Sequence, residues 1–203
     1  LKQSYSNSLM IYDAQEKYGV TLHSAANLSV KGTLIVGKNV RVESLAKIIV
    51  AENSTLTIGD NVWIADSCHI ETSSGSSIDI GCRTTIQSRC QLRGSVNIGT
   101  SVLFAPNVFI SSGKHLYDYS STLGIREQDK KYLRDHKEIY SEPVTIDDDC
   151  WLGINVVVMP GITVERGCVV GANSVVTKSL SPYSVACGVP ARKIKERVHE
   201  VSE

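Results

Sequence analysis

The imidazole of His115 is the side chain that this sequence places best for proton transfer. It follows residues 109–112, where a regular pattern of apolar residues stops and a long irregular segment begins. An imidazole has an unperturbed pKa of about 6.5, so it can take a proton from a hydroxyl group at neutral pH. Taken alone, a loop histidine is more often a surface residue. The nearby Asp118 could orient the imidazole or be an exposed loop residue.

The other histidines and the cysteines do not form a pattern that suits a metal. The other four histidines are isolated from one another, and the six cysteines include no Cys-x-x-Cys pair. These spacings argue against a zinc site and against a disulfide framework, so no metal is expected. His136 lies in a charged segment and is interpreted as solvated, although it would touch an acceptor if that segment folded over the site. Four cysteines occupy small inward positions of the repeat described below and are interpreted as core residues: Cys68, Cys90, Cys150 and Cys168.

Length, charge and hydropathy restrict the class of protein. The chain has 203 residues, and Lys plus Arg equal Asp plus Glu at 21 each, so the formal net charge is zero. This balance gives no electrostatic case for nucleic acid or an anionic membrane as the main partner. No apolar run approaches the roughly 20 residues of a transmembrane helix, and the first residues lack the charged-then-apolar order of a signal peptide. We therefore expect a cytoplasmic protein, in an environment that keeps cysteines reduced.

Apolar residues recur at every sixth position over most of the chain. This period fits neither an amphipathic helix nor a long flat strand. It fits a chain that turns a corner every six residues and forms short parallel strands on three faces, in coils that cover one another's strand edges. A second, smaller inward position is expected four residues after each, as at Val62, Cys68 and Ser74. The repeating apolar residues are Ile58, Ile64, Ile70, Ile80, Ile86, Leu92, Ile98, Phe104, Ile110, Ile146, Leu152, Val158, Val164, Val170 and Val176.

The repeat divides the chain into parts. Weaker hexads extend it upstream to Val30, so residues 1–29 are expected to form an N-terminal cap segment and residues 30–180 the coiled domain. Residues 113–142 break the period completely and are expected to form an extended active-site loop. Residues 181–203 are expected to form a tail, whose charged segment is predicted to be a short C-terminal helix.

Three stretches of the repeat resemble the hexapeptide-repeat acyltransferases. They are residues 144–164, which include Trp-Leu-Gly and Pro-Gly, residues 170–178, and the Gly-Val-Pro-Ala-Arg segment at 188–192. The resemblance covers roughly four fifths of the chain and points to the branch with maltose, galactoside and xenobiotic acetyltransferases and polysaccharide O-acetyltransferases. It implies an all-β solenoid, a left-handed parallel β-helix. It also implies acetyl-CoA as the acetyl donor and a homotrimer with acetyl-CoA in grooves between neighbouring coils.

The resemblance also assigns roles to individual residues. His115 stands where the catalytic histidine of these enzymes stands, Trp151 where a tryptophan borders the active site or the coenzyme channel, and backbone N–H groups around Gly153 are candidate oxyanion donors. The positions that match contacts to acetyl-CoA are Trp151, Ile154, Ala172, Thr177, Lys178, Arg192 and Lys195. Without the resemblance, Trp151 is explained by packing against the loop and the basic residues by a solvated helix face.

The acceptor is predicted less directly. Gln87 and Arg89 lie in a coil where sugar-modifying relatives place polar contacts, and Tyr117 and Asp118 are candidate contacts from the loop. We therefore expect an O-acetyltransferase that modifies a sugar or bacterial surface polysaccharide in a ternary complex with acetyl-CoA. The alternatives are an N-acetyltransferase of an amino-sugar nucleotide and a non-enzymatic β-helix that binds or scaffolds. A zinc carbonic anhydrase on the same coil would need clustered histidines.

Overall fold

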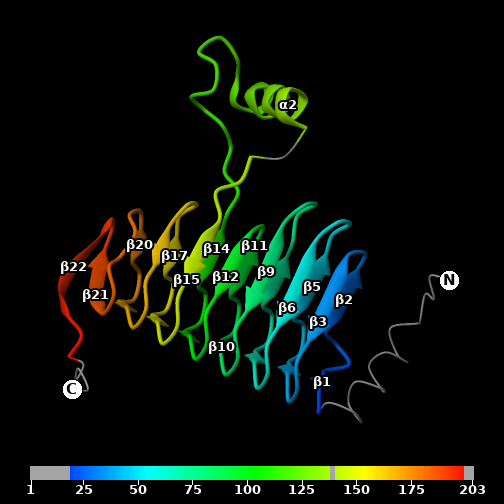
Figure 1. Cartoon of the computed structure of the whole chain (residues 1–203), viewed down its shortest axis with the longest axis vertical. Coiled ribbons are helices and arrows are strands. Elements are labelled where there is room, and N and C mark those ends of the chain that lie inside the picture. Colours follow the sequence, from blue (N-terminus) through cyan, green and yellow to red (C-terminus); the bar gives the residue numbers. More distant parts are fainter. Residues whose placement is uncertain (1–18, 138–139, 199–203) are drawn as a thin grey trace.

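The chain forms a parallel β-solenoid with three faces and one large insert (Figure 1). The computed structural model describes residues 19–137 and 140–198. The chain passes from sheet A to sheet B to sheet C and back, so each of the first six coils adds one strand to every sheet. The predicted solenoid of three-sided coils is confirmed. The left-handed sense of the coil remains an expectation from the family resemblance.

Each sheet consists of short strands stacked in register. Sheet A contains β1 (Thr21–Leu22), β4 (Arg41–Val42), β7 (Trp63–Ile64), β10 (Thr85–Ile86), β13 (Leu103–Phe104), β16 (Trp151–Leu152), β19 (Val169–Val170), β21 (Ser184–Gly188) and β22 (Ala191–Glu196). Sheet B contains β2 (Asn27–Val30), β5 (Lys47–Val50), β8 (His69–Glu71), β11 (Gln91–Arg93), β14 (Phe109–Ser111), β17 (Val157–Val158) and β20 (Val175–Val176). Sheet C contains β3 (Thr33–Val36), β6 (Thr55–Ile58), β9 (Ser77–Ile80), β12 (Val96–Ile98), β15 (Val144–Ile146) and β18 (Thr163–Val164).

The core is the stack of apolar residues that the period identifies. All fifteen repeating residues are buried, and most of the smaller inward positions are buried as well. Ile86, Phe104 and Leu152 lie directly above one another in sheet A, so each covers apolar surface that a single coil would leave exposed. Ser74 does not follow the pattern: it is exposed, because the chain makes a wider turn between β8 and β9.

Asparagines at the corners between sheets A and B, here called the A–B corners, hold successive coils together. Asn107, Asn155 and Asn173 have positive φ angles of 58–63°, a conformation that asparagine tolerates better than most residues. The Asn107 side chain donates to Asn155 at 2.9 Å, and Asn155 donates to Asn173 at 2.8 Å. This ladder fixes the positions of the turns that carry several predicted site residues.

The insert leaves the solenoid between β14 and β15, at the corner between sheets B and C (a B–C corner). It contains one helix, α2 (Ile125–His136), where the sequence predicted only a loop. An antiparallel bridge between Gly113 and Ser141 closes the base of the insert. Gln128 is the buried residue of α2, and its amide accepts from Ser120 N–H at 3.0 Å and donates to the Leu123 carbonyl at 2.9 Å.

Both ends of the solenoid differ from the predicted boundaries. The predicted C-terminal helix is wrong: Ala191–Glu196 is strand β22, antiparallel to β21. The backbone groups at the end of sheet A need partners, and this need overrides the helical propensity of a short charged segment. At the other end strands begin at Thr21 rather than near residue 30, and Leu22 and Leu28 pack partly on the core. Residues 1–18 of the expected cap lie outside the described residues.

Candidate functional site

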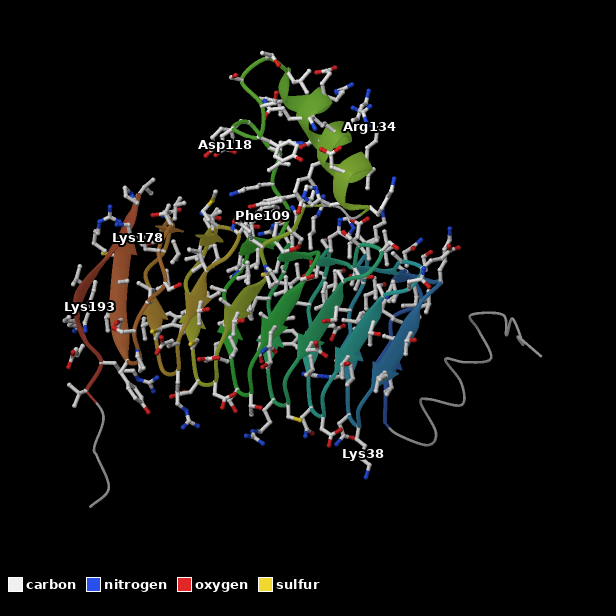
Figure 2. All side chains as sticks on the ribbon, turned by 45° about the horizontal axis from the view of Figure 1, so that its top comes forward. Lys38, Phe109, Asp118, Arg134, Lys178 and Lys193 are labelled. Carbon is white, nitrogen blue, oxygen red and sulfur yellow. The ribbon has the colours of Figure 1, made fainter. Side chains whose placement is uncertain are left out.

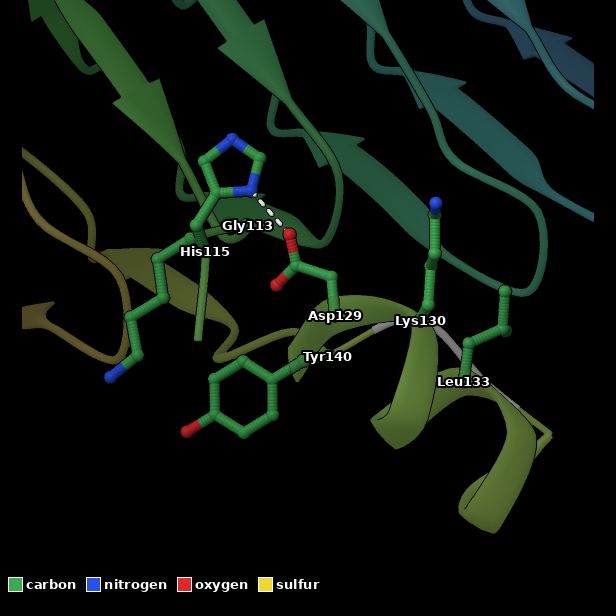
Figure 3. A pocket seen from close by; sticks show the side chains of 7 residues that line it. Gly113, His115, Asp129, Lys130, Leu133 and Tyr140 are labelled. Carbon is green, nitrogen blue, oxygen red and sulfur yellow. Dashed lines mark hydrogen bonds and ion pairs between the residues drawn. The ribbon is translucent and has the colours of Figure 1, made fainter. Parts of the chain in front are cut away.

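His115 is paired with a carboxylate that comes from helix α2. Its Nδ1 atom lies 2.6 Å from Asp129 Oδ2, and the other carboxylate oxygen accepts the backbone N–H of Leu116 at 2.9 Å (Figure 3). The two residues are brought together because the insert folds back over its own beginning. The Leu116 N–H and then His115 hold the pKa of Asp129 below its usual range, so the carboxylate is ionised at neutral pH.

The ionised carboxylate determines the tautomer of His115. A carboxylate can only accept a hydrogen bond, so Nδ1 carries a hydrogen, and in the neutral imidazole Nε2 is the nitrogen with the free lone pair. The other ring nitrogen points away from Asp129 (Figure 3), and the His115 side chain is 83% exposed. The imidazole is therefore oriented as a base that an external hydroxyl can reach.

A hollow of about 400 Å³ surrounds this pair. Tyr140 lines one side, and Lys130 and Leu133 of α2 line another (Figure 3). Lys114 also lines the hollow, with its Nζ atom 5.3 Å from the centre of the Tyr140 ring. Lys114 Nζ lies 2.9 Å from Glu142 Oε1, and the Tyr140 hydroxyl donates to the same carboxylate. These contacts join the two strands at the base of the insert and so fix the floor of the hollow.

The structure keeps Trp151 accessible and changes the interpretation of Gly153. Trp151 lies in β16 on the outer face of sheet A and is 52% exposed, so it is available to a ligand or to another chain. The Gly153 N–H already donates to the Val170 carbonyl at 2.8 Å. That N–H is therefore already used within the solenoid, and the oxyanion donors predicted around Gly153 would be neighbouring N–H groups. A Cβ at Gly153 would lie 2.7 Å from the Ala172 backbone nitrogen, so glycine is needed there for the coils to stack.

Two neighbouring positions do present backbone donors. Ile154 and Ala172 are exposed at successive A–B corners. Among the described residues, neither N–H has an intramolecular hydrogen-bond partner. An extended chain with amide groups, such as a pantetheine arm, could accept a hydrogen bond from each of these N–H groups. These positions therefore fit the acetyl-CoA contacts predicted for them.

The remaining predicted coenzyme residues lie elsewhere on the last coils. Thr177 and Lys178 are exposed at a B–C corner, after β20. Arg192 and Lys195 are exposed on strand β22 at the end of sheet A. The predicted acetyl-CoA contacts of one chain therefore lie at two kinds of corner and at the end of sheet A. Arg192 and Lys195 provide positive charge for phosphate groups.

The predicted acceptor residues are separated in the same way. Gln87 and Arg89 lie at an A–B corner, where Arg89 Nε donates to Asn107 at 2.8 Å. Tyr117 and Asp118 are exposed in the insert, which rises above the solenoid (Figure 2). The structure shows no hydrogen bond from Asp118 to His115 among the described residues; Asp129 has that position instead.

Asp129 was missed because its partner is fourteen residues earlier in the chain. The signal that could have indicated it is the segment 125–136, whose residues are mostly charged good helix formers with no glycine or proline. Among the described residues, no group of three or more His, Cys, Asp or Glu side chains is placed to hold a metal ion. No described helix has the length and apolar character needed to cross a membrane.

Comparison with known proteins identifies the fold and the repeat. A family model described as the hexapeptide repeat of succinyl-transferase matches residues 143–178. Galactoside O-acetyltransferase of Escherichia coli (strain K12) is 41% identical over 102 residues, 50% of this chain and 44% of the relative. Chloramphenicol acetyltransferase of Klebsiella aerogenes is 33% identical over 106 residues, 51% of this chain and 48% of the relative. The chain thus spans about half the length of the curated relatives it matches.

Solved structures show the same solenoid over nearly the whole chain. The polysialic acid O-acetyltransferase OatWY has 22% sequence identity and a TM-score of 0.62, covering 91% of each chain. A mutant of AntD, an N-acyltransferase from Bacillus cereus in complex with dTDP-4-amino-4,6-dideoxyglucose and coenzyme A, has 18% identity and a TM-score of 0.59, covering 98% of this chain and 93% of that one. Residues 143–178 thus carry the hexapeptide repeat of that family model, and the fold is the solenoid of these acyltransferase structures.

Proposed function

We propose that this protein is an acetyl-CoA-dependent O-acetyltransferase that modifies a hydroxyl of a sugar or of a bacterial surface polysaccharide. The observation that carries the proposal is the hydrogen bond between His115 Nδ1 and Asp129 Oδ2, which leaves Nε2 free in an accessible hollow. Acyl transfer to a hydroxyl needs a base at this position, and such a base contributes about 10²–10⁴-fold to the rate.

The reaction follows from the orientation of the imidazole. His115 Nε2 takes the proton of the acceptor hydroxyl while its oxygen attacks, and Asp129 stabilises the positive charge that develops on the ring. Bound acetyl-CoA would supply the acetyl group as a thioester: its C–S bond would break as the new C–O bond forms, and the thiolate would take the proton from His115. The transfer is thus direct within a ternary complex. The exposed N–H groups of Ile154 and Ala172 hold the pantetheine arm, and Arg192 and Lys195 attract the phosphates.

A homotrimer accounts for the distribution of these residues. His115 lies at a B–C corner, whereas Trp151 lies on sheet A and Ile154 at an A–B corner of the same chain. A neighbouring copy would bring its A–B corner opposite the B–C corner of the first, and so complete a site between two chains. The reduced thiols of all six cysteines suit a cytoplasmic enzyme.

Sugar-modifying relatives support a carbohydrate acceptor. Galactoside O-acetyltransferase and a polysialic acid O-acetyltransferase are among the similar proteins. The AntD structure, an N-acyltransferase with a bound sugar nucleotide, supports a second candidate function, N-acetylation of an amino-sugar nucleotide. The two functions differ in the nucleophile: O-acetylation uses a sugar hydroxyl and gives an ester, whereas N-acetylation uses the amino group and gives an amide. Both need a base to take the proton of the nucleophile.

Release of free coenzyme A thiol from acetyl-CoA tests the proposal. Wild type and His115→Ala are compared on oligosaccharides, free monosaccharides and amino-sugar nucleotides. We expect thiol release that depends on an oligosaccharide acceptor and falls by about 10²–10⁴-fold in the variant. Stabilisation by coenzyme A, measured as a rise in Tm, shows that the variant is folded and binds. Equal activity of the variant, or acetylation of amino sugars alone, would overturn O-acetylation by His115.

A further inference from the structure

A larger hollow adjoins the His115 pocket, on the side of the earlier coils. It has a volume of about 710 Å³ and shares Gly113 and Tyr140 with the pocket around His115. Turns at the B–C corners of successive coils form one side, and the insert, through Tyr132, Lys137 and Tyr140, forms the other. A chain-like ligand in this hollow would therefore lead directly to the catalytic imidazole.

The lining of this hollow is rich in hydroxyl groups. Seven serines line it: six come from the coil turns and the end of β14, before Gly113, and the seventh, Ser141, comes from the base of the insert. Among the described residues, the hydroxyls of Ser74 and Ser95 have no hydrogen-bond partner. Hydroxyls of this kind can donate to and accept from the hydroxyls of a sugar. The exposed position of Ser74, which breaks the hexad pattern, places its side chain in this lining.

Two cations and one carboxylate also line the hollow. The cations are Arg93 and Lys137, and the carboxylate is Glu71. Glu71 Oε2 lies 3.2 Å from His69 Nε2, at ion-pair distance but without hydrogen-bond geometry. Within the described part of the chain, neither Arg93 nor Lys137 forms an ion pair with a carboxylate. The lining therefore has an excess of positive charge.

His69 holds the guanidinium of Arg93 in place. An Arg93 Nη2 N–H donates to His69 Nδ1 at 3.0 Å, which requires the imidazole to be neutral. Burial, and then the charge of Arg93, lower the pKa of His69 and keep it neutral. Arg93 Nε is buried and has no hydrogen-bond partner. The side chain is thus fixed on one edge while part of its donor capacity is unused.

We propose that this hollow binds the acceptor, and that the acceptor is a glycan with carboxylate groups, recognised by Arg93 and Lys137. The proposal rests on the proposed function, because it places the acceptor beside His115. A guanidinium matches the planar geometry of a carboxylate. The serine hydroxyls contact the sugar hydroxyls, and a neutral glycan would leave the two cations without an ion pair.

Direct binding tests this inference without any acetyl transfer. Tetrasaccharides of galacturonic, glucuronic and sialic acid are titrated by calorimetry against wild type, each alongside its neutral methyl ester. We expect at least one charged probe to bind at least about tenfold more tightly than its ester, as one lost charged hydrogen bond implies. Arg93→Gln and Lys137→Gln should each remove most of that preference. Arg134→Gln is the control: it removes one positive charge from helix α2 at a position outside the hollow, so the preference for the charged probe should remain.

The outcomes separate this inference from the proposed function. Equal binding of charged and neutral probes, failure of every charged probe to bind, or a preference that survives both substitutions would overturn the inference. Lys137 is exposed, so Lys137→Gln remains informative if Arg93→Gln does not fold. Charged probes that bind through Arg93 but release no thiol from acetyl-CoA would overturn the proposed function alone. Acetylation of neutral glycans that Arg93→Gln does not change would overturn the inference alone.

Discussion

Asp129 contacts both the imidazole of His115 and the next backbone amide, that of Leu116, with its two carboxylate oxygens at 2.6 and 2.9 Å. One carboxylate thus fixes the ring and the main chain that carries it. Because Asp129 belongs to helix α2, the orientation of the base depends on the folding of the insert. The insert is therefore part of the candidate catalytic apparatus as well as one wall of the site.

Replacement of Asp129 by asparagine tests this dependence. The amide can still accept one of the two hydrogen bonds but does not stabilise a positively charged ring. We expect kcat to fall by at least about tenfold, with little change in KM for acetyl-CoA. Asp129→Glu should recover part of the activity. Asp135→Asn, on the same helix but bonded to Lys131 and Tyr119, serves as the control. An unchanged kcat in Asp129→Asn would show that the pair has no role in catalysis.

Gln128 should determine how firmly the insert is folded. Its amide satisfies Ser120 N–H and the Leu123 carbonyl, and only 3% of the residue is exposed. In Gln128→Ala the partly buried Ser120 N–H and Leu123 carbonyl lose their hydrogen bonds, each of which typically contributes about 0.5–1.5 kcal/mol. We expect faster proteolysis within the insert and lower activity, with the Tm of the solenoid little changed. Arg126→Ala, a substitution at an exposed position of the same helix, should leave the cleavage rate as in wild type. Equal cleavage rates for Gln128→Ala and Arg126→Ala would contradict the role of Gln128 in holding the insert.

The solenoid could be predicted from the sequence because every coil repeats the same local requirement. A position such as Ile86 or Leu152 is apolar in each hexad, since each must cover the coil beside it. Strand β22 could not be predicted in this way. Its conformation is imposed by the unpaired edge of β21, which no local pattern in the segment indicates.

The candidate site could be predicted only in part. His115 marks the end of the regular repeat, so the period itself points to it. Its partner Asp129 depends on how an insert of mostly exposed residues folds back, and neither hydrophobic periodicity nor spacing encodes that contact. At Gly153 the hexad pattern already indicates a small residue, and the close approach to the Ala172 backbone explains why that residue is glycine.

The packing role of Gly153 leads to a prediction about stability. A Cβ there would lie 2.7 Å from Ala172 N and 3.0 Å from the Val170 carbonyl oxygen, both backbone atoms that cannot rotate away. We expect Gly153→Ala to lower the free energy of unfolding by about 1–3 kcal/mol, as overpacking typically does. Urea unfolding gives the value. At Gly113 a Cβ would meet only Ser111 Oγ at 3.8 Å, so Gly113→Ala should be nearly neutral. Wild-type stability of Gly153→Ala would show that the coils can separate at no cost.

The insert should loosen in acid before the solenoid does. Hydrogen bonds from Leu116 and then His115 lower the pKa of Asp129, and those from Tyr140 and then Lys114 lower the pKa of Glu142. A carboxyl whose pKa is lowered by folding stabilises the fold fully above its ordinary pKa, near 3.8 for Asp and 4.5 for Glu. That contribution is lost as the pH falls through the lowered value.

Amide hydrogen exchange at Leu116, corrected for the intrinsic effect of pH, measures this loss. Protection should be constant from pH 7 to about 5 and should decrease below the ordinary carboxyl pKa values. The Gly153 amide, bonded to the Val170 carbonyl within the solenoid, provides the internal reference. In Asp129→Asn the partner of Leu116 no longer titrates, so much of the acid sensitivity at that amide should disappear. If Leu116 stays as protected as Gly153 down to pH 3, the carboxylates do not hold the insert in place.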